Sequence, residues 1–344
     1  MQTFLHTELP LIQAPMAGVQ DYRLAAAVSN SGGLGSLPCA MLSKEQLTDE
    51  ITKLCQATDK SYNLNFFCHE VIGYSQQQKQ QWQQLLSPYL KEHGIDEPSL
   101  GMTATRQPID EEIVKLIAPF KPPVVSFHFG LPSDDIVQEI KSWGSKVIAS
   151  ATTVDEAKWL EANGADAVIA QGLEAGGHRG HFLSMDLTLQ QATTALVEQC
   201  VGALDVPVIA AGGIATAEDV TQMMGMGACA VQVGSAYLLC QEATTSALHR
   251  KAILQQSANS TALTTVFSGR AARGIKNRVM YELGCMPEQA PPFPYASIAL
   301  GALRAKSENQ GKADFSPLWC SEKYIVRDAI SAREITKELM AAYA

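Results

Sequence analysis

The sequence lacks the features of membrane-spanning, secreted and nucleic-acid-binding chains. No apolar run approaches the ~18 residues that a transmembrane helix requires. The N-terminus has no basic segment followed by a long apolar stretch, so we expect no secretory signal. Lys and Arg total 26 against 35 Asp and Glu, which gives a net charge of −9. This acidic balance argues against nucleic acid or an anionic membrane as a partner.

Paired cysteines are also absent. The eight cysteines are scattered along the chain, and none forms a Cys-x-x-Cys pair. In a chain of 344 residues this pattern is typical of reduced thiols rather than of a disulfide framework. No spacing of Cys and His fits a zinc site. We therefore predict a cytoplasmic protein without a bound metal.

Two nucleotide-binding fingerprints are missing as well. The first apolar segment, residues 10–16, is not followed by G-x-G-x-x-G, which argues against a dinucleotide-binding Rossmann half. No glycine-rich loop carries the lysine of an ATP-binding P-loop. The composition is otherwise that of an ordinary globular protein with a large core, since 46% of the residues are hydrophobic and 18% are charged.

Short apolar segments alternate with amphipathic helical segments in the first two thirds of the chain. The apolar segments are nearly continuous, which predicts strands that are buried on both faces. We expect them at residues 10–16, 33–37, 62–67, 123–127, 146–150, 165–170, 206–210 and 228–233. Most are followed by a predicted helix. This pattern predicts an α/β fold of the (β/α)8 TIM barrel type, with an open doubly wound sheet as the competing architecture.

The other segments predict a second, smaller part of the molecule. A polar, Gln-rich stretch interrupts the barrel pattern at about residues 69–119, and the barrel helix of that unit is expected near residues 110–118. After residue 240 the chain becomes helical, with glycine- and arginine-rich and proline-rich stretches. We predict a barrel over residues 1–240 and a mainly helical cap over its mouth at residues 241–344. The alternative is a small second domain interleaved with the insertion.

Two glycine turns fall after the seventh and eighth strands, where barrels commonly bind phosphate. Gly212 and Gly213 follow the seventh strand, and Gly234 and Ser235 follow the eighth. Glycine lets backbone N–H groups approach an anion, and the serine hydroxyl can add a hydrogen bond. The alternative is a pair of tight turns without a ligand. Because a P-loop lysine is missing, the turns favour a cofactor monophosphate over ATP.

A long glycine-rich loop, QGLEAGGHRG, follows the sixth strand at residues 171–180. Loops of this length between a strand and a helix are more often functional than structural. His178 titrates near neutrality and can take a proton from carbon, and its glycine neighbours permit close approach to a flat ligand. Arg179 either holds an anion or is a solvated loop charge. His178 itself could also be a surface histidine without a role.

Three other strand ends carry residues that suit a pocket. His128 ends the fourth strand, where it either points into the mouth of the barrel or lies in its wall. Asn65 is polar within an apolar run, and a buried amide needs the partners that a heterocycle would supply. The segment Ala14, Pro15 and Met16 offers small groups and backbone to a planar ring, although a methionine also suits simple core filling.

Seven segments, taken in chain order, resemble the nitronate monooxygenases, formerly called 2-nitropropane dioxygenases. They are QAPMAGV, GGLGSL, NLNFF, SFHFG, QGLEAGGHRG, PVIAAGGI and VQVGSAYL. The resemblance spans about residues 8–240. The later stretch FSGRAARGIKN and the region 303–319 are similar to class I members of the family.

This resemblance implies a barrel that binds FMN without a covalent bond. It implies FMN contacts from Asn65, Gln171, Gly176, Gly213, Gln232, Val233, Gly234 and Ser235, with Ala14, Pro15 and Met16 behind the flavin ring. By the same resemblance, His178 matches the active-site histidine of the family. His128 matches a histidine that lines the substrate pocket.

The implied reaction is oxidation by O2 of alkyl nitronates such as propionate 3-nitronate, through a flavin semiquinone, to a carbonyl product and nitrite. A protonated His178 and Arg179 would offset the negative charge of the substrate. With a neutral nitroalkane, His178 would act as the base. The alternatives are an FMN-dependent enoyl-acyl-carrier-protein reductase that uses NAD(P)H, and a flavin-binding protein without turnover. We expect a monomer or homodimer.

Overall fold

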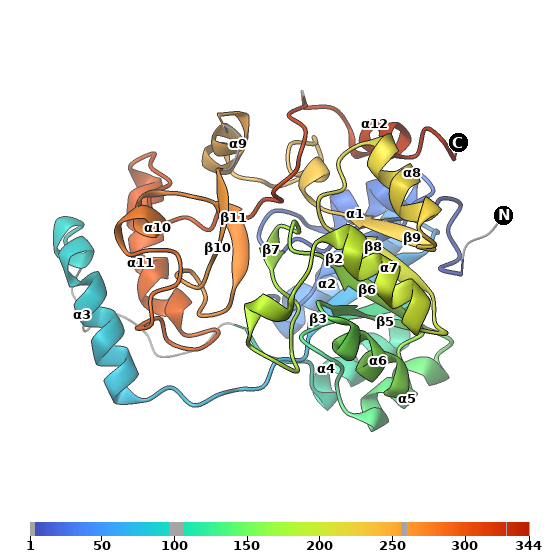
Figure 1. Ribbon diagram of the computed structural model, residues 1–344, viewed down its shortest axis with the longest axis horizontal. Coiled ribbons are helices and arrows are strands. Elements are labelled where there is room, and N and C mark those ends of the chain that lie inside the picture. The colour runs from blue at the N-terminus through green and yellow to red at the C-terminus, as the bar shows by residue number, and fades with distance from the viewer. Residues whose placement is uncertain (1–3, 96–105, 256–259, 328, 344) are drawn as a thin grey trace.

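Eight parallel strands form the centre of the computed structural model, which describes residues 4–95, 106–255, 260–327 and 329–343 (Figure 1). The strands are β1 (Leu11–Gln13), β2 (Gly35–Pro38), β3 (Tyr62–Phe67), β4 (Val124–His128), β5 (Lys146–Ala151), β6 (Ala167–Gln171), β8 (Val208–Ala211) and β9 (Ala230–Val233). Pairing runs β1-β9-β8-β6-β5-β4-β3-β2, and a parallel bridge between Ile12 and Leu34 brings β1 back towards β2. The predicted TIM barrel is confirmed, and the open sheet is wrong because the ring closes.

The two faces of the strands explain why their sequences are apolar throughout. Ile12, Val124 and Ile148 belong to a buried cluster made almost entirely of strand residues, which fills the inside of the barrel. Their neighbours Leu11 and Val125 belong to a separate cluster that includes the surrounding helices. Successive side chains of a strand point to opposite faces, so both faces must be apolar.

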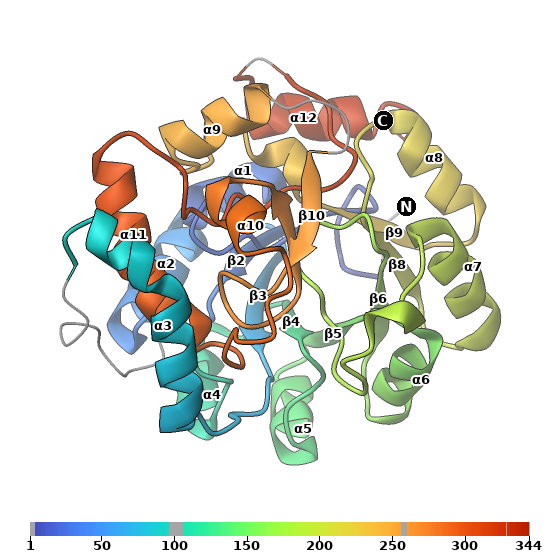
Figure 2. The ribbon, with the colours of Figure 1, turned by 60° about the vertical axis from the view of Figure 1, so that its left-hand side comes forward.

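The outer ring of helices includes one from the far end of the chain. The ring consists of α1 (Tyr22–Ser29), α2 (Lys44–Ala57), α4 (Glu111–Ile117), α5 (Asp134–Ser142), α6 (Val154–Ala162), α7 (Thr193–Ala203), α8 (Ala217–Gly225) and α12 (Ala332–Leu339). α4 is the helix predicted near residues 110–118. α12 packs against α1 and α8 and buries Ile335 and Leu339 in the cluster between the strands and the surrounding helices (Figure 2). The prediction placed α12 in a cap at residues 241–344. In the structure this helix instead buries its apolar face against the barrel.

A second part of the molecule combines the insertion with the C-terminal region. Its helices are α3 (Gln76–Glu92), α10 (Arg278–Glu282) and α11 (Ala296–Asn309), which stand apart from the barrel in Figure 1. α3 packs against α11 over a shared core that includes Trp82 and Phe315. An ion pair of 2.7 Å between Arg278 and Glu92 joins α10 to the end of α3. The insertion therefore contributes α3 to this second part and α4 to the barrel.

A small antiparallel sheet connects the histidine loop to the C-terminal region. It consists of β7 (Gly177–His178), β10 (Thr261–Thr264) and β11 (Ala272–Ile275), and His178 is paired with Ala272. α9 (Ala247–Leu254) and the 3-10 helices η2 (Ala118–Phe120), η3 (Leu187–Leu189) and η4 (Ser235–Tyr237) complete the described elements. The sequence carries no signal for β7, since two residues are too few to show a period.

None of the eight cysteines forms a disulfide. Burial raises the pKa of Cys200 and of Cys240 to about 12, so both stay protonated near neutral pH. Among the helices that the structure describes, none is long and apolar enough to cross a bilayer.

Candidate active site

A pocket opens at the C-terminal ends of the barrel strands, the face on which barrel enzymes place their chemistry. It holds about 1370 Å³ of empty space, part of it open to solvent. Fourteen of the fifteen predicted site residues line it: Ala14, Pro15, Met16, Asn65, His128, Gln171, Gly176, His178, Gly212, Gly213, Gln232, Val233, Gly234 and Ser235. The fold thus brings these residues together, while their individual roles stay predictions.

The two predicted phosphate turns lie at the ends of paired strands and are bridged by the C-terminal segment. Gly213 has a φ of 68°, which side chains rarely adopt. Its N–H donates to Ser321 Oγ (3.3 Å), and the Ser321 N–H donates to Ser235 Oγ (2.8 Å). Ser321 Oγ donates in turn to Glu174 O (2.7 Å). One serine therefore connects both turns to the histidine loop, and no signal in the sequence pointed to it.

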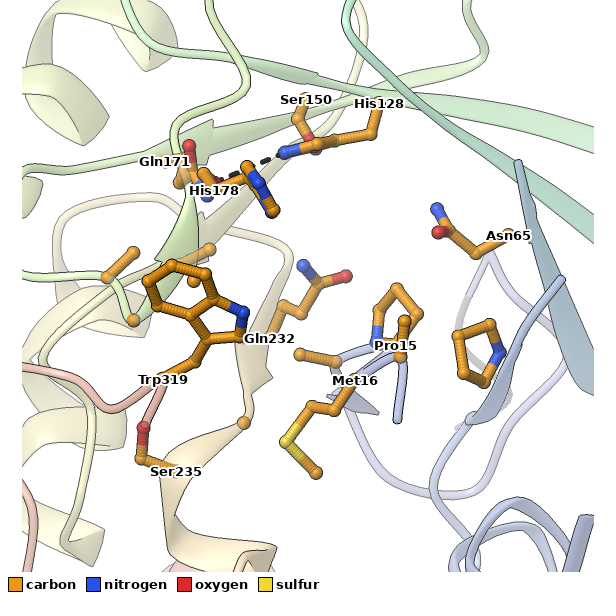
Figure 3. Close-up of a pocket in the computed structure, with 18 of the residues that line it drawn as sticks. Pro15, Met16, Asn65, His128, Ser150, Gln171, His178, Gln232, Ser235 and Trp319 are labelled. Carbon is orange, nitrogen blue, oxygen red and sulfur yellow. Dashed lines mark hydrogen bonds between the residues drawn. The ribbon is translucent and has the colours of Figure 1, made fainter. Parts of the chain in front are cut away.

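The segment after β1 forms the opposite wall. Gln20 Oε1 accepts from the Met16 N–H (2.8 Å) and from Gln13 Nε2 (2.7 Å), which fixes the backbone of this segment. A Cβ added at Gly234 would lie 3.3 Å from the Ala14 Cβ, so the turn after β9 packs closely on this segment. In Figure 3, Pro15 and Met16 lie across the pocket from His178.

These features fit the predicted flavin. Gln232 Oε1 is buried and has no partner among the described residues, and a ring N–H would satisfy it. The Asn65 amide is nearly buried and donates to Ser126 Oγ (2.9 Å), which holds its side chain at the pocket edge. A flat ring against the Ala14–Met16 wall would direct a phosphate towards the two glycine turns, where backbone N–H groups suit an anion.

His178 lies on β7 inside an aromatic cluster. Its Nε2 is 2.8 Å from Ser268 Oγ, and its ring centroid is 5.5 Å from that of Phe293 and 5.4 Å from that of Trp319. Burial, followed by the positive charge of Arg106, lowers the pKa of His178 well below its ordinary value. The imidazole is therefore neutral near pH 7. This state argues against the predicted charge stabilisation by a protonated His178 and leaves the base role open.

Gln171 and His128 hold the main chain at His178. Gln171 Nε2 donates to His178 O (2.9 Å), and Gln171 Oε1 accepts from the Gly180 N–H (2.7 Å). His128 Nε2 lies 3.2 Å from the same carbonyl (Figure 3). Because a carbonyl only accepts, this nitrogen carries the proton. Burial lowers the pKa of His128 to about 3, so the residue is a neutral donor in the pocket wall.

The prediction that Arg179 binds the substrate is wrong in this structure. The side chain is fully buried, and its guanidinium donates to Gln190 Oε1 (2.8 Å), Gly172 O (2.6 Å) and Gln171 O (2.7 Å). Burial lowers the pKa of Arg179 to about 9, which leaves it charged near pH 7. Arg179 thus ties the histidine loop to the end of β6. Sequence position alone could not distinguish this role, because the same glycines surround a buried or an exposed arginine.

The pocket also contains residues that reasoning from strand ends did not select. Trp319 lies two residues before Ser321, His249 lies in α9, and Arg106 lies within the insertion, before α4. Burial lowers the pKa of His249 to about 4, so it too is neutral near pH 7. Reasoning from strand ends did not reach these residues, because only the folded second part of the molecule places them over the barrel.

The charge of the pocket is carried by one side chain. Among the described lining residues, Arg106 is the only Lys, Arg, Asp or Glu. Within the same described ranges, no group of three or more His, Cys, Asp or Glu side chains could hold a metal ion. A positively charged, otherwise neutral pocket favours anionic ligands.

Known proteins share this sequence and architecture. The profile of the nitronate monooxygenase family matches residues 1–342. A nitronate monooxygenase of Paraburkholderia phytofirmans is 37% identical over 338 residues, which cover 97% of this chain and 92% of the relative. Nitroalkane oxidase from Streptomyces ansochromogenes superposes with a TM-score of 0.89 at 31% identity, covering 97% of this chain and 95% of the other. FabK from Thermotoga maritima superposes with a TM-score of 0.72 at 25% identity, covering 98% and 94%. The chain belongs to the nitronate monooxygenase family, a family of flavin-dependent oxidoreductases.

Proposed function

We propose that the protein uses FMN and O2 to oxidise alkyl nitronates to a carbonyl product and nitrite. The observation that carries this proposal is a neutral His178 in a pocket whose described lining contains a cation and no carboxylate. Such a pocket suits a small carbanion-like anion. FMN is favoured over a dinucleotide because the only phosphate-type turns expected from the sequence lie together at the ends of β8 and β9. When bound, FMN would supply the electron transfer between substrate and O2.

The residues around His178 would position and protect the substrate. Ser268 Oγ donates to Arg270 O (3.3 Å), which leaves it free to accept from His178 Nε2. In that tautomer His178 Nδ1 has the lone pair that can remove an α-proton from a neutral nitroalkane. The aromatic rings of Phe293 and Trp319 exclude water from this side of the imidazole.

Oxygen uptake by the purified protein tests the proposal. With propionate 3-nitronate as substrate we expect O2 consumption and nitrite release that do not require NADH. Rapid anaerobic bleaching of the bound flavin by NADH or NADPH would instead favour the enoyl-acyl-carrier-protein reductase. A yellow protein that consumes no O2 with any nitronate would favour the flavin-binding protein without turnover.

Replacing His178 separates its role as a base from a role in charge stabilisation. His178→Ala should lower turnover of a neutral nitroalkane by about 10²–10⁴-fold, because general bases typically contribute that much. Turnover of the corresponding nitronate, which has already lost the proton, should fall much less. Equal losses on both substrates in steady-state assays would contradict the base assignment.

A further inference from the structure

Arg106 is a pocket cation that nothing in the described structure neutralises. Its guanidinium carbon lies 5.7 Å from the centroid of the Phe293 ring, and Nη1 is 3.4 Å from Ser297 Oγ. Within the described ranges no Asp or Glu pairs with it, and the charged side chain that acts on it is another cation, Arg304. The first turn of α11, where Ser297 lies, contains no acidic residue either.

Partial burial makes this isolated charge costly. Burial, followed by the repulsion of Arg304, lowers the pKa of Arg106. A guanidinium removed from water is stabilised when it donates to an anion, because charge-assisted hydrogen bonds replace its lost hydration. The side chain is thus better satisfied with an anionic ligand in the pocket than without one.

The position of Arg106 distinguishes a substrate anion from the cofactor phosphate. The phosphate turns lie at the ends of β8 and β9 and are bridged by Ser321. Arg106 instead contacts the second part of the molecule, and its charge acts on His178. Arg106 is therefore on the His178 side of the pocket, away from the phosphate turns, where the substrate would lie.

The Phe293 ring lies beside both Arg106 and His178. The Phe293 ring centroid is 5.5 Å from the His178 ring and 5.7 Å from the Arg106 guanidinium carbon. Because both side chains pack against the same ring, a short chain with an anionic group at each end can contact both. We propose that Arg106 is a specificity-determining residue that binds a carboxylate at the end of the nitronate remote from the reacting carbon. This proposal rests on the proposed function for the nitronate end of the substrate.

Paired substrates test the assignment in the flavin-loaded enzyme. Propionate 3-nitronate carries the carboxylate, and propyl-1-nitronate has the same number of carbons without it. Arg106→Gln should lower kcat/KM for propionate 3-nitronate by about 10–100-fold, mainly through KM, since hydrogen bonds to charged groups contribute about that factor. For propyl-1-nitronate, the same substitution should change kcat/KM by less than about 3-fold. The decisive quantity is therefore the ratio of kcat/KM for propionate 3-nitronate to kcat/KM for propyl-1-nitronate.

Two further variants separate charge from structure. Arg106→Lys keeps the charge and should restore part of the selectivity, with the remainder lost because lysine cannot donate in the fork geometry of arginine. Arg333→Gln removes an exposed charge in α12 that is outside the pocket lining. This matched control should leave the selectivity unchanged. If Arg106→Gln does not fold, Arg106→Lys should still raise KM for propionate 3-nitronate alone.

A binding experiment decides the assignment independently of turnover. Anaerobic calorimetric titration would compare 3-nitropropionate with 1-nitropropane, which lacks the carboxylate. We expect the wild-type enzyme to prefer 3-nitropropionate and Arg106→Gln to lose that preference. Equal loss on both nitronates, or an unchanged preference in Arg106→Gln, would overturn the role of Arg106 while the proposed function stands. Absence of oxidation of either nitronate would reject the proposed function, and the titration would still test Arg106.

Discussion

Replacing Arg179 by methionine tests whether this residue positions the histidine loop or binds substrate. The change removes the donors to Gln190 Oε1, Gly172 O and Gln171 O, of which Gly172 O still accepts from the Ala175 N–H (3.2 Å). Each acceptor left without a donor costs about 1–3 kcal/mol. Removal of a buried charge offsets several kcal/mol of that loss. We therefore expect a net destabilisation of about 3 kcal/mol, with much of the side-chain volume retained by methionine.

The melting temperature converts this free energy into a measurement. An unfolding entropy of about 2.1 cal/mol/K per residue amounts to ~0.7 kcal/mol/K for this chain, so Arg179→Met should lower Tm by about 4 °C in calorimetry. The exposed Arg333, replaced in the same way, is the matched control and should change stability by less than about 0.5 kcal/mol.

Kinetics of the same variant separate the two roles of Arg179. Because the loop carries His178, kcat should fall by about 10-fold, whereas KM for nitronates should change little, since a displaced catalytic group affects the reaction more than binding. An increase in KM of more than about 10-fold with an unchanged Tm would refute the positioning role and restore the substrate contact expected from the sequence.

Two other predictions concern the cofactor and the pH dependence of stability. Ser321→Ala should weaken FMN binding by about 5–30-fold in a fluorescence titration, because the variant loses two hydrogen bonds that connect the phosphate turns to the histidine loop. An unchanged affinity would contradict the role of Ser321 in connecting them. Burial lowers the pKa of His69 and His249 to about 4 and of His128 and His181 to about 3. These folded pKa values lie below the unfolded value near 6.5, so the unfolded chain binds more protons than the folded chain between pH 6.5 and 4. The free energy of unfolding is therefore full above pH 6.5. Below pH 6.5 it falls by about 1.4 kcal/mol per pH unit for each histidine. Urea midpoints at pH 7, 6 and 5 should decrease steadily, and a constant midpoint would be inconsistent with neutral buried histidines.

Reasoning from the sequence predicted some residues of the site correctly and others wrongly. Strand-end positions located Asn65 and His128 in the pocket, because parallel strands of a barrel end on one face, and the family resemblance added Gln171. The same reasoning misplaced Arg179, since position in a loop does not determine which way a side chain points. It also left the protonation of His178 open, because desolvation depends on the rings that surround the imidazole.

The sequence by itself determined the barrel, its strand ends, the glycine turns and the identity of the histidine loop. These depend on local pattern and on a periodicity that repeats along the chain. Only the tertiary structure brought Arg106, His249, Trp319 and Ser321 over the barrel mouth and returned α12 to its wall. Contacts between segments so far apart in the chain arise from the packing of the second part of the molecule on the barrel. The charge and protonation of the pocket follow from that packing, because burial and neighbouring charges act through space rather than along the sequence.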